Sequence, residues 1–278
     1  MDIYFVPQVW EDIKSANNYH WYLDCYLDQM KKAEEEYGTR LLDVLDIHYY
    51  SESAREGAED RVQSVRTLYE KGFRENSWIG QWCQENVLIL PTIQKSIDTY
   101  YPRTKLAITE YNFGGGTDVS GTIAQAEALG CYADAGVYFA TLWGGESYIF
   151  SGIKLYTNYD GENSQFGDTL VSTKTEDVSK LSSYAAINGD DTGLVTAMIT
   201  NKSMSEKENA IINLDNSDKQ YKSAAVYGDS SEIRLIDKVE NISDNKVEVE
   251  LPAFSAAMVV ISENADEFSD KEIYDENK

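Results

Sequence analysis

The sequence predicts an α/β region at residues 1–155, followed by an all-β region at residues 156–262. In the first region, apolar segments at 41–50, 105–111 and 137–143 alternate with stretches of helical periodicity, as in parallel βα units. In the second region, short segments rich in β-branched residues recur between polar turns, which predicts an antiparallel β-sandwich.

The first predicted helix covers residues 19–37 and is followed by Gly38, a residue that commonly ends helices. Its apolar positions recur at intervals of three and four and so share one face. These positions are Tyr22, Tyr26, Met30, Ala33 and Tyr37. Strand 41–50 comes next, and residues 58–71 again show helical periodicity.

The region 76–101 holds two tryptophans and then a helix that Pro102 closes before strand 105–111. A glycine-rich loop leads to a predicted helix at 120–134, and strand 137–143 follows. The strands expected in the β-sandwich are 193–200, 209–214, 221–227, 233–239, 246–251 and 254–261. The mostly charged residues 263–278 are expected to form an acidic, disordered tail.

The composition restricts the partners of this chain. Among 278 residues, 24 Lys and Arg stand against 48 Asp and Glu, which gives a net charge of −24. A surface this acidic repels phosphate backbones, so no nucleic-acid partner is expected, whereas a neutral polysaccharide is compatible with it. No apolar run is long enough to span a bilayer, and the first residues do not resemble a signal peptide.

Several chemistries find no support in the sequence. The three cysteines, Cys25, Cys83 and Cys131, lie far apart and form no metal-binding spacing. The nucleophile elbow, the phosphate-binding loop, the zinc-protease helix and the dinucleotide fingerprint are all absent from the sequence. We therefore predict neither a metal site nor a cofactor.

The three apolar segments end in residues that suit sugar chemistry. The first ends in His48, Tyr49 and Tyr50, the second leads into Glu110, and the third ends in Trp143. The carboxyl edge of a parallel sheet is where β/α barrels hold their active sites. Glu110 is the candidate nucleophile of a glycosidase, with a carboxylate that caps a turn or pairs with a base as the alternative.

Residues near Glu110 are predicted to bind it or the substrate. His48 and Tyr50 lie two apart on one strand and face the same side, so a tyrosine hydroxyl there is placed to hydrogen-bond Glu110. Trp78 and Trp82 lie one helical turn apart if that stretch is helical, and their rings suit pyranose faces, as does Trp143. A core position remains the alternative for each tryptophan and for His48.

The number of predicted strands does not decide whether the α/β region belongs to a closed barrel. A (β/α)8 barrel needs eight strands in about 250 residues. The first 155 residues of this chain show three convincing parallel strands. Either the N-terminal half of a barrel is missing, or the region forms a smaller open sheet.

Taken together, these segments resemble glycoside hydrolase family 44, endoglucanases and xyloglucanases that cleave β-1,4-glucans. The resemblance covers residues 20–262 and rests on four segments. They are Leu41–Tyr50, Ile108–Asn112, Ala140–Trp143 and Asn158–Asp168. It implies the C-terminal part of a TIM-like (β/α)8 barrel, strands 5 to 8, followed by an antiparallel β-sandwich, and a reaction that retains anomeric configuration.

Carried over by position, Glu110 resembles the family nucleophile at the end of strand 7. His48, Tyr49 and Tyr50 would end strand 6, and Trp78, Trp82 and Trp143 resemble the sugar platforms. The family's acid/base glutamate follows an asparagine, but this sequence contains no Asn-Glu pair.

The resemblance therefore implies a truncated chain that lacks the acid/base glutamate and the N-terminal barrel half. Its expected partner is a β-1,4-glucan or hemicellulose, with no membrane partner, and the expected location is extracellular. The alternative is a non-catalytic glucan-binding or remnant protein.

Overall fold

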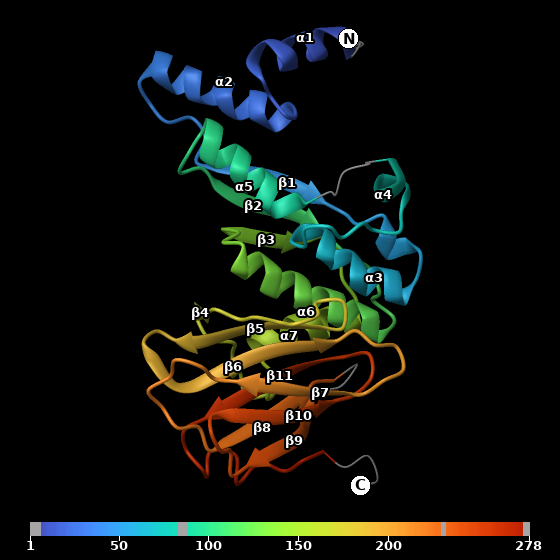
Figure 1. The fold of residues 1–278 in the computed structure, drawn as a ribbon, viewed down its shortest axis with the longest axis vertical. Helices are drawn as coiled ribbons and strands as arrows, with labels where there is room; N and C mark the ends of the chain where they lie inside the picture. Colours follow the sequence, from blue (N-terminus) through green and yellow to red (C-terminus); the bar gives the residue numbers. More distant parts are fainter. Residues whose placement is uncertain (1–6, 83–87, 229–231, 275–278) are drawn as a thin grey trace.

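The computed structural model describes residues 7–82, 88–228 and 232–274, and its elements stack along one long axis (Figure 1). Helices α1 (Pro7–Asn17) and α2 (Tyr22–Tyr37) lie at one end, and antiparallel strands lie at the other. A small parallel sheet with its helices lies between them. The structure thus contains both predicted kinds of sheet, in the predicted order along the chain.

The parallel sheet has three strands in the order β1 (Val44–Tyr49), β2 (Lys105–Tyr111) and β3 (Phe139–Leu142). Helix α6 (Val119–Asp134) connects β2 to β3. Between β1 and β2 the chain forms the helices η1 (Ser53–Arg55), α3 (Ala58–Ser64), η2 (Val65–Leu68), α4 (Trp78–Trp82) and α5 (Ile89–Tyr100). Both pairings are parallel, as the βα alternation of the sequence predicts.

The two faces of this sheet differ in burial. Leu45 and Ile108 belong to the main apolar core, which the helices of the α/β region share. On the opposite face Asp46, His48 and Phe139 are exposed. Because these side chains are exposed, this face of the sheet is open within the described residues, whereas parallel sheets are normally covered on both faces. Strands β1 and β3 are the two edges of the sheet.

Antiparallel strands build the rest of the structure. Six of them form a sheet in the order β4-β5-β6-β11-β8-β9, and β10 pairs with β7 in a second sheet. Their bounds are β4 (Thr169–Val171), β5 (Leu181–Asn188), β6 (Asp191–Asn201), β7 (Glu208–Asn213), β8 (Ser223–Gly228), β9 (Arg234–Glu240), β10 (Lys246–Leu251) and β11 (Ser255–Ser262). Val247 and Val249 of the smaller sheet pack with Val226 and Val259 of the larger one in a second apolar core.

The larger antiparallel sheet also packs on the α/β region. Met198 of β6, Tyr184 of β5 and Met258 of β11 belong to the same apolar core as Ile123 of α6. Helix α6 therefore lies between two sheets, and most of its side chains are buried. A helix that is covered on all sides shows little amphipathic periodicity.

Some elements differ from the prediction. The helix predicted at 58–71 divides into α3 and the 3₁₀ turn η2. Helix α7 (Ser147–Thr157), helix α1, and strands β4 and β5 have no counterpart among the predicted elements.

The prediction of a disordered tail is wrong for residues 263–274. Phe268 is buried against the main core, and the backbone N–H of Tyr274 donates a hydrogen bond to the carbonyl of Leu235. Lys271 also pairs with Glu162. One apolar anchor and specific backbone contacts order this charged segment, while residues 275–278 lie outside the described residues.

Candidate active site

Glu110 lies near the carboxyl end of β2 and receives two contacts from the end of β1. The Tyr50 hydroxyl donates a hydrogen bond to Glu110 Oε2 at 3.1 Å. His48 Nδ1 lies 3.4 Å from the same oxygen, an ion pair whenever the imidazole is protonated. The structure therefore brings together three of the residues that the sequence analysis singled out.

The protonation of Tyr50 suits its role as a donor. Partial burial, followed by the hydrogen bond to Glu110 and the negative charge of that carboxylate, raises the pKa of Tyr50 above its ordinary value. At neutral pH the hydroxyl therefore keeps its proton. It is therefore available as a hydrogen-bond donor to the Glu110 carboxylate.

A tyrosine behind Glu110 fixes the end of its strand. Tyr111 is buried on the helix side of β2, where its hydroxyl accepts a hydrogen bond from Gln125 of α6 at 2.7 Å. Its ring also meets that of Tyr132, on the same helix, edge-on at 5.1 Å between centroids. These contacts make the position of Glu110 depend on a rigid helix.

Tyr49 does not face this site, which corrects the prediction that it binds substrate there. Its hydroxyl is buried, and its ring lies against Phe113 on the helix side of the sheet. Burial raises its pKa well above the ordinary value. The alternation of side chains along β1 explains this position, because His48 and Tyr50 take the open face and Tyr49 the other.

The predicted aromatic platforms lie in two places. Trp143 follows β3 and is 65% exposed, and Trp78 begins α4 and is 60% exposed. Trp82 ends α4, but its side chain lies outside the described part of the chain, as does all of Cys83. Exposure of two large rings removes the core alternative for Trp78 and Trp143.

Asn112 is a residue of this edge that the site prediction missed. Its side-chain amide donates to the carbonyl of Trp143 at 2.8 Å and accepts from the N–H of Gly114 at 2.6 Å. It thereby ties the end of β2 to the end of β3. Its place directly after Glu110 and Tyr111 was the available signal.

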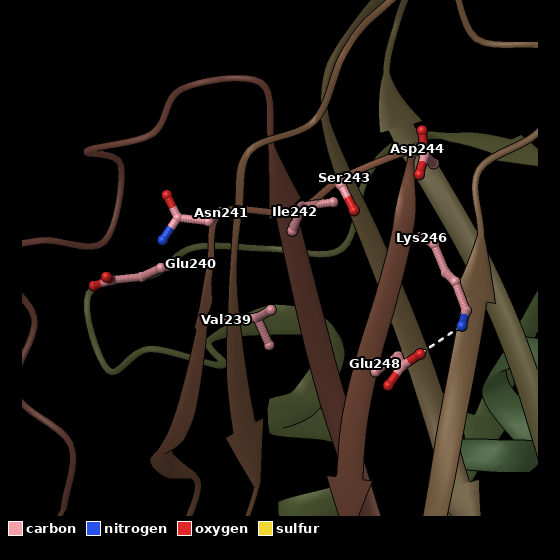
Figure 2. Close-up of a pocket in the computed structure, with 8 residues that line it drawn as sticks. All are labelled: Val239, Glu240, Asn241, Ile242, Ser243, Asp244, Lys246 and Glu248. Atoms are coloured by element: carbon pink, nitrogen blue, oxygen red, sulfur yellow. Dashed lines mark hydrogen bonds and ion pairs between the residues drawn. The ribbon is translucent and has the colours of Figure 1, made fainter.

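The described residues contain no group of three or more His, Cys, Asp or Glu side chains that could hold a metal ion. A hollow of about 400 Å³ opens elsewhere, where β9 turns into β10 (Figure 2). Its lining includes Glu240, Asp244 and Glu248, and Lys246 pairs with the last of these. None of the predicted site residues lies there, so the candidate site remains the edge around Glu110.

Among the described residues, no helix is long and apolar enough to cross a membrane.

Comparisons with known proteins find relatives in one family. The family model described as glycoside hydrolase family 44 matches residues 1–53. Endoglucanase A of Paenibacillus lautus is 39% identical over 269 residues, which cover 90% of this chain and 38% of that protein. Beta-mannanase/endoglucanase A of Caldicellulosiruptor saccharolyticus is 36% identical over 88% of this chain and 20% of its own length.

A solved structure extends the match to the fold. A Paenibacillus polymyxa xyloglucanase from glycoside hydrolase family 44 superposes with a TM-score of 0.86 at 38% identity, over 92% of this chain and 53% of that one. The chain thus spans about half the length of that solved relative, and less of the two curated ones. Sequence and fold together support the assignment of this chain to glycoside hydrolase family 44.

Proposed function

We propose that this chain supplies the nucleophile of a retaining endo-β-1,4-glucanase or xyloglucanase. The observation that carries the proposal is the Tyr50 hydrogen bond to Glu110 on the open face of a parallel sheet, beside His48. Retaining glycosidases use one carboxylate to attack the anomeric carbon and a second carboxyl group to protonate the leaving oxygen.

Each residue has a defined part in the proposed reaction. Glu110 attacks the anomeric carbon, the bond to the leaving sugar breaks, and a glycosyl ester forms on Glu110. Tyr50 orients the carboxylate before the attack by donating a hydrogen bond to it, and His48 adds a second donor when protonated. Water then hydrolyses the ester and releases the product with its original anomeric configuration.

The substrate is proposed to be a neutral glucan chain. Trp143 and Trp78 offer exposed rings for the apolar faces of sugars, and Trp82 is proposed as a third platform. The relatives are named endoglucanase and xyloglucanase, which fits a β-1,4-glucan or a related hemicellulose. The net charge of −24 does not oppose an uncharged polymer. Polymers of this kind lie outside the cell, so we propose an extracellular location.

We further propose that strands outside this sequence complete a (β/α)8 barrel, in which β1, β2 and β3 are strands 6, 7 and 8. Two features of the described residues support this. Neither β1 nor β3 pairs with a further strand, and the face that carries Asp46 and His48 is exposed. Among the described contacts of Glu110, the side-chain partners are His48 and Tyr50, and neither is a carboxylate. The proton donor is therefore proposed to come from the completing segment.

The nucleophile is testable without a proton donor. A dinitrophenyl β-cellobioside with fluorine beside the anomeric carbon loses dinitrophenolate, which needs no protonation to leave. Attack by Glu110 then leaves a stable fluoroglycosyl ester, visible as an added mass on the peptide that contains residue 110. We expect this label on the wild-type chain and none on the Glu110→Gln variant.

A label on another carboxylate, or equal labelling of the Glu110→Gln variant, would show that the nucleophile is misassigned.

The second candidate function is glucan binding without cleavage, which the two exposed tryptophans also favour. Retention of the chain by a xyloglucan gel, with no label at residue 110 and no released reducing sugar, would select that function.

A further inference from the structure

We propose that Asp46 and Thr141 are positioning residues that clamp Thr109 and thereby aim Glu110 at the substrate. The inference deepens the proposed function, because it assumes that Glu110 is the nucleophile. It rests on an irregularity in β2 and on the side chains that satisfy it. Neither residue is proposed to touch the reacting atoms.

The irregularity is one extra residue in β2. Against β1, Ile108 pairs with Ile47, but the next pair is Glu110 with His48, so Thr109 is skipped. The pairing with β3 also shifts between Ile108 and Tyr111. An extra residue of this kind forms a β-bulge, which leaves its polar groups without their regular partners and redirects the following side chain.

The bulge determines which face Glu110 occupies. In a regular strand Glu110 would share a face with Ile108, which is fully buried among the helices. An unpaired carboxylate buried there would be costly. With Thr109 as the extra residue, Glu110 reaches the open face beside His48 and Tyr50, and Tyr111 takes the buried face.

Side chains of both neighbouring strands satisfy the polar groups of Thr109. Its backbone N–H donates to Asp46 Oδ1 at 3.0 Å, and its hydroxyl donates to Asp46 Oδ2. Its carbonyl accepts a hydrogen bond from the Thr141 hydroxyl. Asp46 thus takes the place of the missing ladder partner on the β1 side, and Thr141 does so on the β3 side.

A catalytic role for Asp46 itself is less consistent with these contacts. Both of its carboxylate oxygens accept hydrogen bonds from Thr109. It also lies two residues before His48, which places it about 6.6 Å deeper along the strand than the groups that meet Glu110. Its geometry is that of a support beneath the nucleophile.

The experiment compares Asp46→Ala with the conservative Asp46→Asn in the intact chain. Asn keeps an acceptor for the Thr109 N–H, whereas Ala removes both acceptors. Asp43→Asn is the matched control, because that exposed carboxylate pairs with Arg40 and lies before β1. Two quantities are measured: hydrogen exchange of the Thr109 amide, and the kinetics of labelling by the dinitrophenyl fluorocellobioside.

We expect Asp46→Ala to speed exchange of the Thr109 amide about tenfold and to lower the maximal labelling rate about tenfold. The reagent concentration for half-maximal rate should change less than about twofold, because a misaimed nucleophile affects the bond-forming step and not binding. Asp46→Asn should recover most of the rate, and Asp43→Asn should match the wild type. Thr141→Val should show the same split more weakly.

Each failure has its own signature. If Asp46→Ala labels Glu110 at the wild-type rate, the clamp does not position the nucleophile, while the proposed function stands. If the wild-type chain takes no label, the proposed function fails. Thr109 exchange then decides the clamp alone, and an unchanged rate in Asp46→Ala would overturn it. Should Asp46→Ala not fold, Thr141→Val must show the split, and its absence overturns the inference.

Discussion

Lys202 and Glu127 form an ion pair of 2.6 Å whose two side chains are fully buried between helix α6 and the antiparallel sheet. Glu127 Oε1 also accepts hydrogen bonds from the hydroxyls of Tyr69 and Ser182, at 2.7 Å and 3.0 Å. Lys202 donates further to the carbonyl of Val178 at 2.7 Å. Burial lowers the pKa of Lys202, against the opposing influence of Glu127. This network joins the α/β region to the antiparallel strands.

Removing one member of that pair should destabilise the protein. Lys202→Met leaves the Glu127 charge buried without its counter-ion, and we expect the free energy of unfolding to fall by about 3 to 5 kcal/mol. The matched control is Lys207→Met, whose pair with Glu250 is exposed and should contribute less than about 1 kcal/mol. Urea unfolding measures both. A double variant, Glu127→Leu with Lys202→Met, should lose less than Lys202→Met alone, and equal losses would contradict the buried-charge argument.

A methyl group at Gly130 should disrupt the same interface. A Cβ at this position of α6 would lie 2.2 Å from the Tyr184 ring and 2.8 Å from the Tyr156 hydroxyl. Within an exposed helix, Gly→Ala stabilises by about 1 kcal/mol. Here we expect Gly130→Ala to destabilise by about 1 to 3 kcal/mol through overpacking. Thermal unfolding gives the sign directly, and a raised melting temperature would show that the interface has room.

Loss of the Trp143 ring should weaken glucan binding. The ring is exposed, and the Trp143 backbone N–H donates to the carbonyl of Tyr111, the residue that follows Glu110. We expect Trp143→Ala to reduce affinity for xyloglucan about fivefold to tenfold. Electrophoresis through gels that contain xyloglucan measures this affinity. Tyr37→Ala is the control, because Tyr37 is also exposed but ends α2, away from the carboxyl edge of the sheet. Equal migration of the two variants would remove Trp143 from the binding surface.

Acid should selectively weaken the loop around Asp160. Burial alone would raise the pKa of this carboxyl, but hydrogen bonds from the Ser164 hydroxyl and from the N–H groups of Glu162 and Ser164 outweigh it and lower the pKa. A lowered folded-state pKa stabilises the protein above the unfolded value, and this contribution is lost as pH falls through the folded value.

The stability difference between wild type and Asp160→Asn should therefore stay constant above about pH 5 and shrink as the pH falls through about 4 and below. Chemical unfolding at several pH values tests this. A constant difference over the whole range would contradict the prediction.

Much of the fold follows from local patterns. The helix expected at 19–37 is α2, and Gly38 ends it in a left-handed conformation at φ +72°. The three apolar segments are the three parallel strands, and their short length favoured a strand over a buried helix. Helix α7 was not predicted, since it follows directly on the turn at Gly144 and Gly145 in an apolar stretch that lacks a charged face.

The residues of the candidate site were likewise predictable only in part. The period of two along β1 predicts that His48 and Tyr50 share a face, and both contact Glu110. The same period places Asp46 on that face and Tyr49 on the other. Site selection by residue type alone therefore included Tyr49 and omitted Asp46.

By itself the sequence determined the order of the three parallel strands, helix α2, the acidic composition and the residues that end each parallel strand. These properties depend on neighbours within a few positions. Only the tertiary structure decided the bulge that turns Glu110, because Asp46 satisfies Thr109 across a separation of 63 residues. The same holds for Lys202, whose counter-ion lies 75 residues away in the chain. Contacts at such distances form only when the whole fold brings the strands together, so no local pattern encodes them.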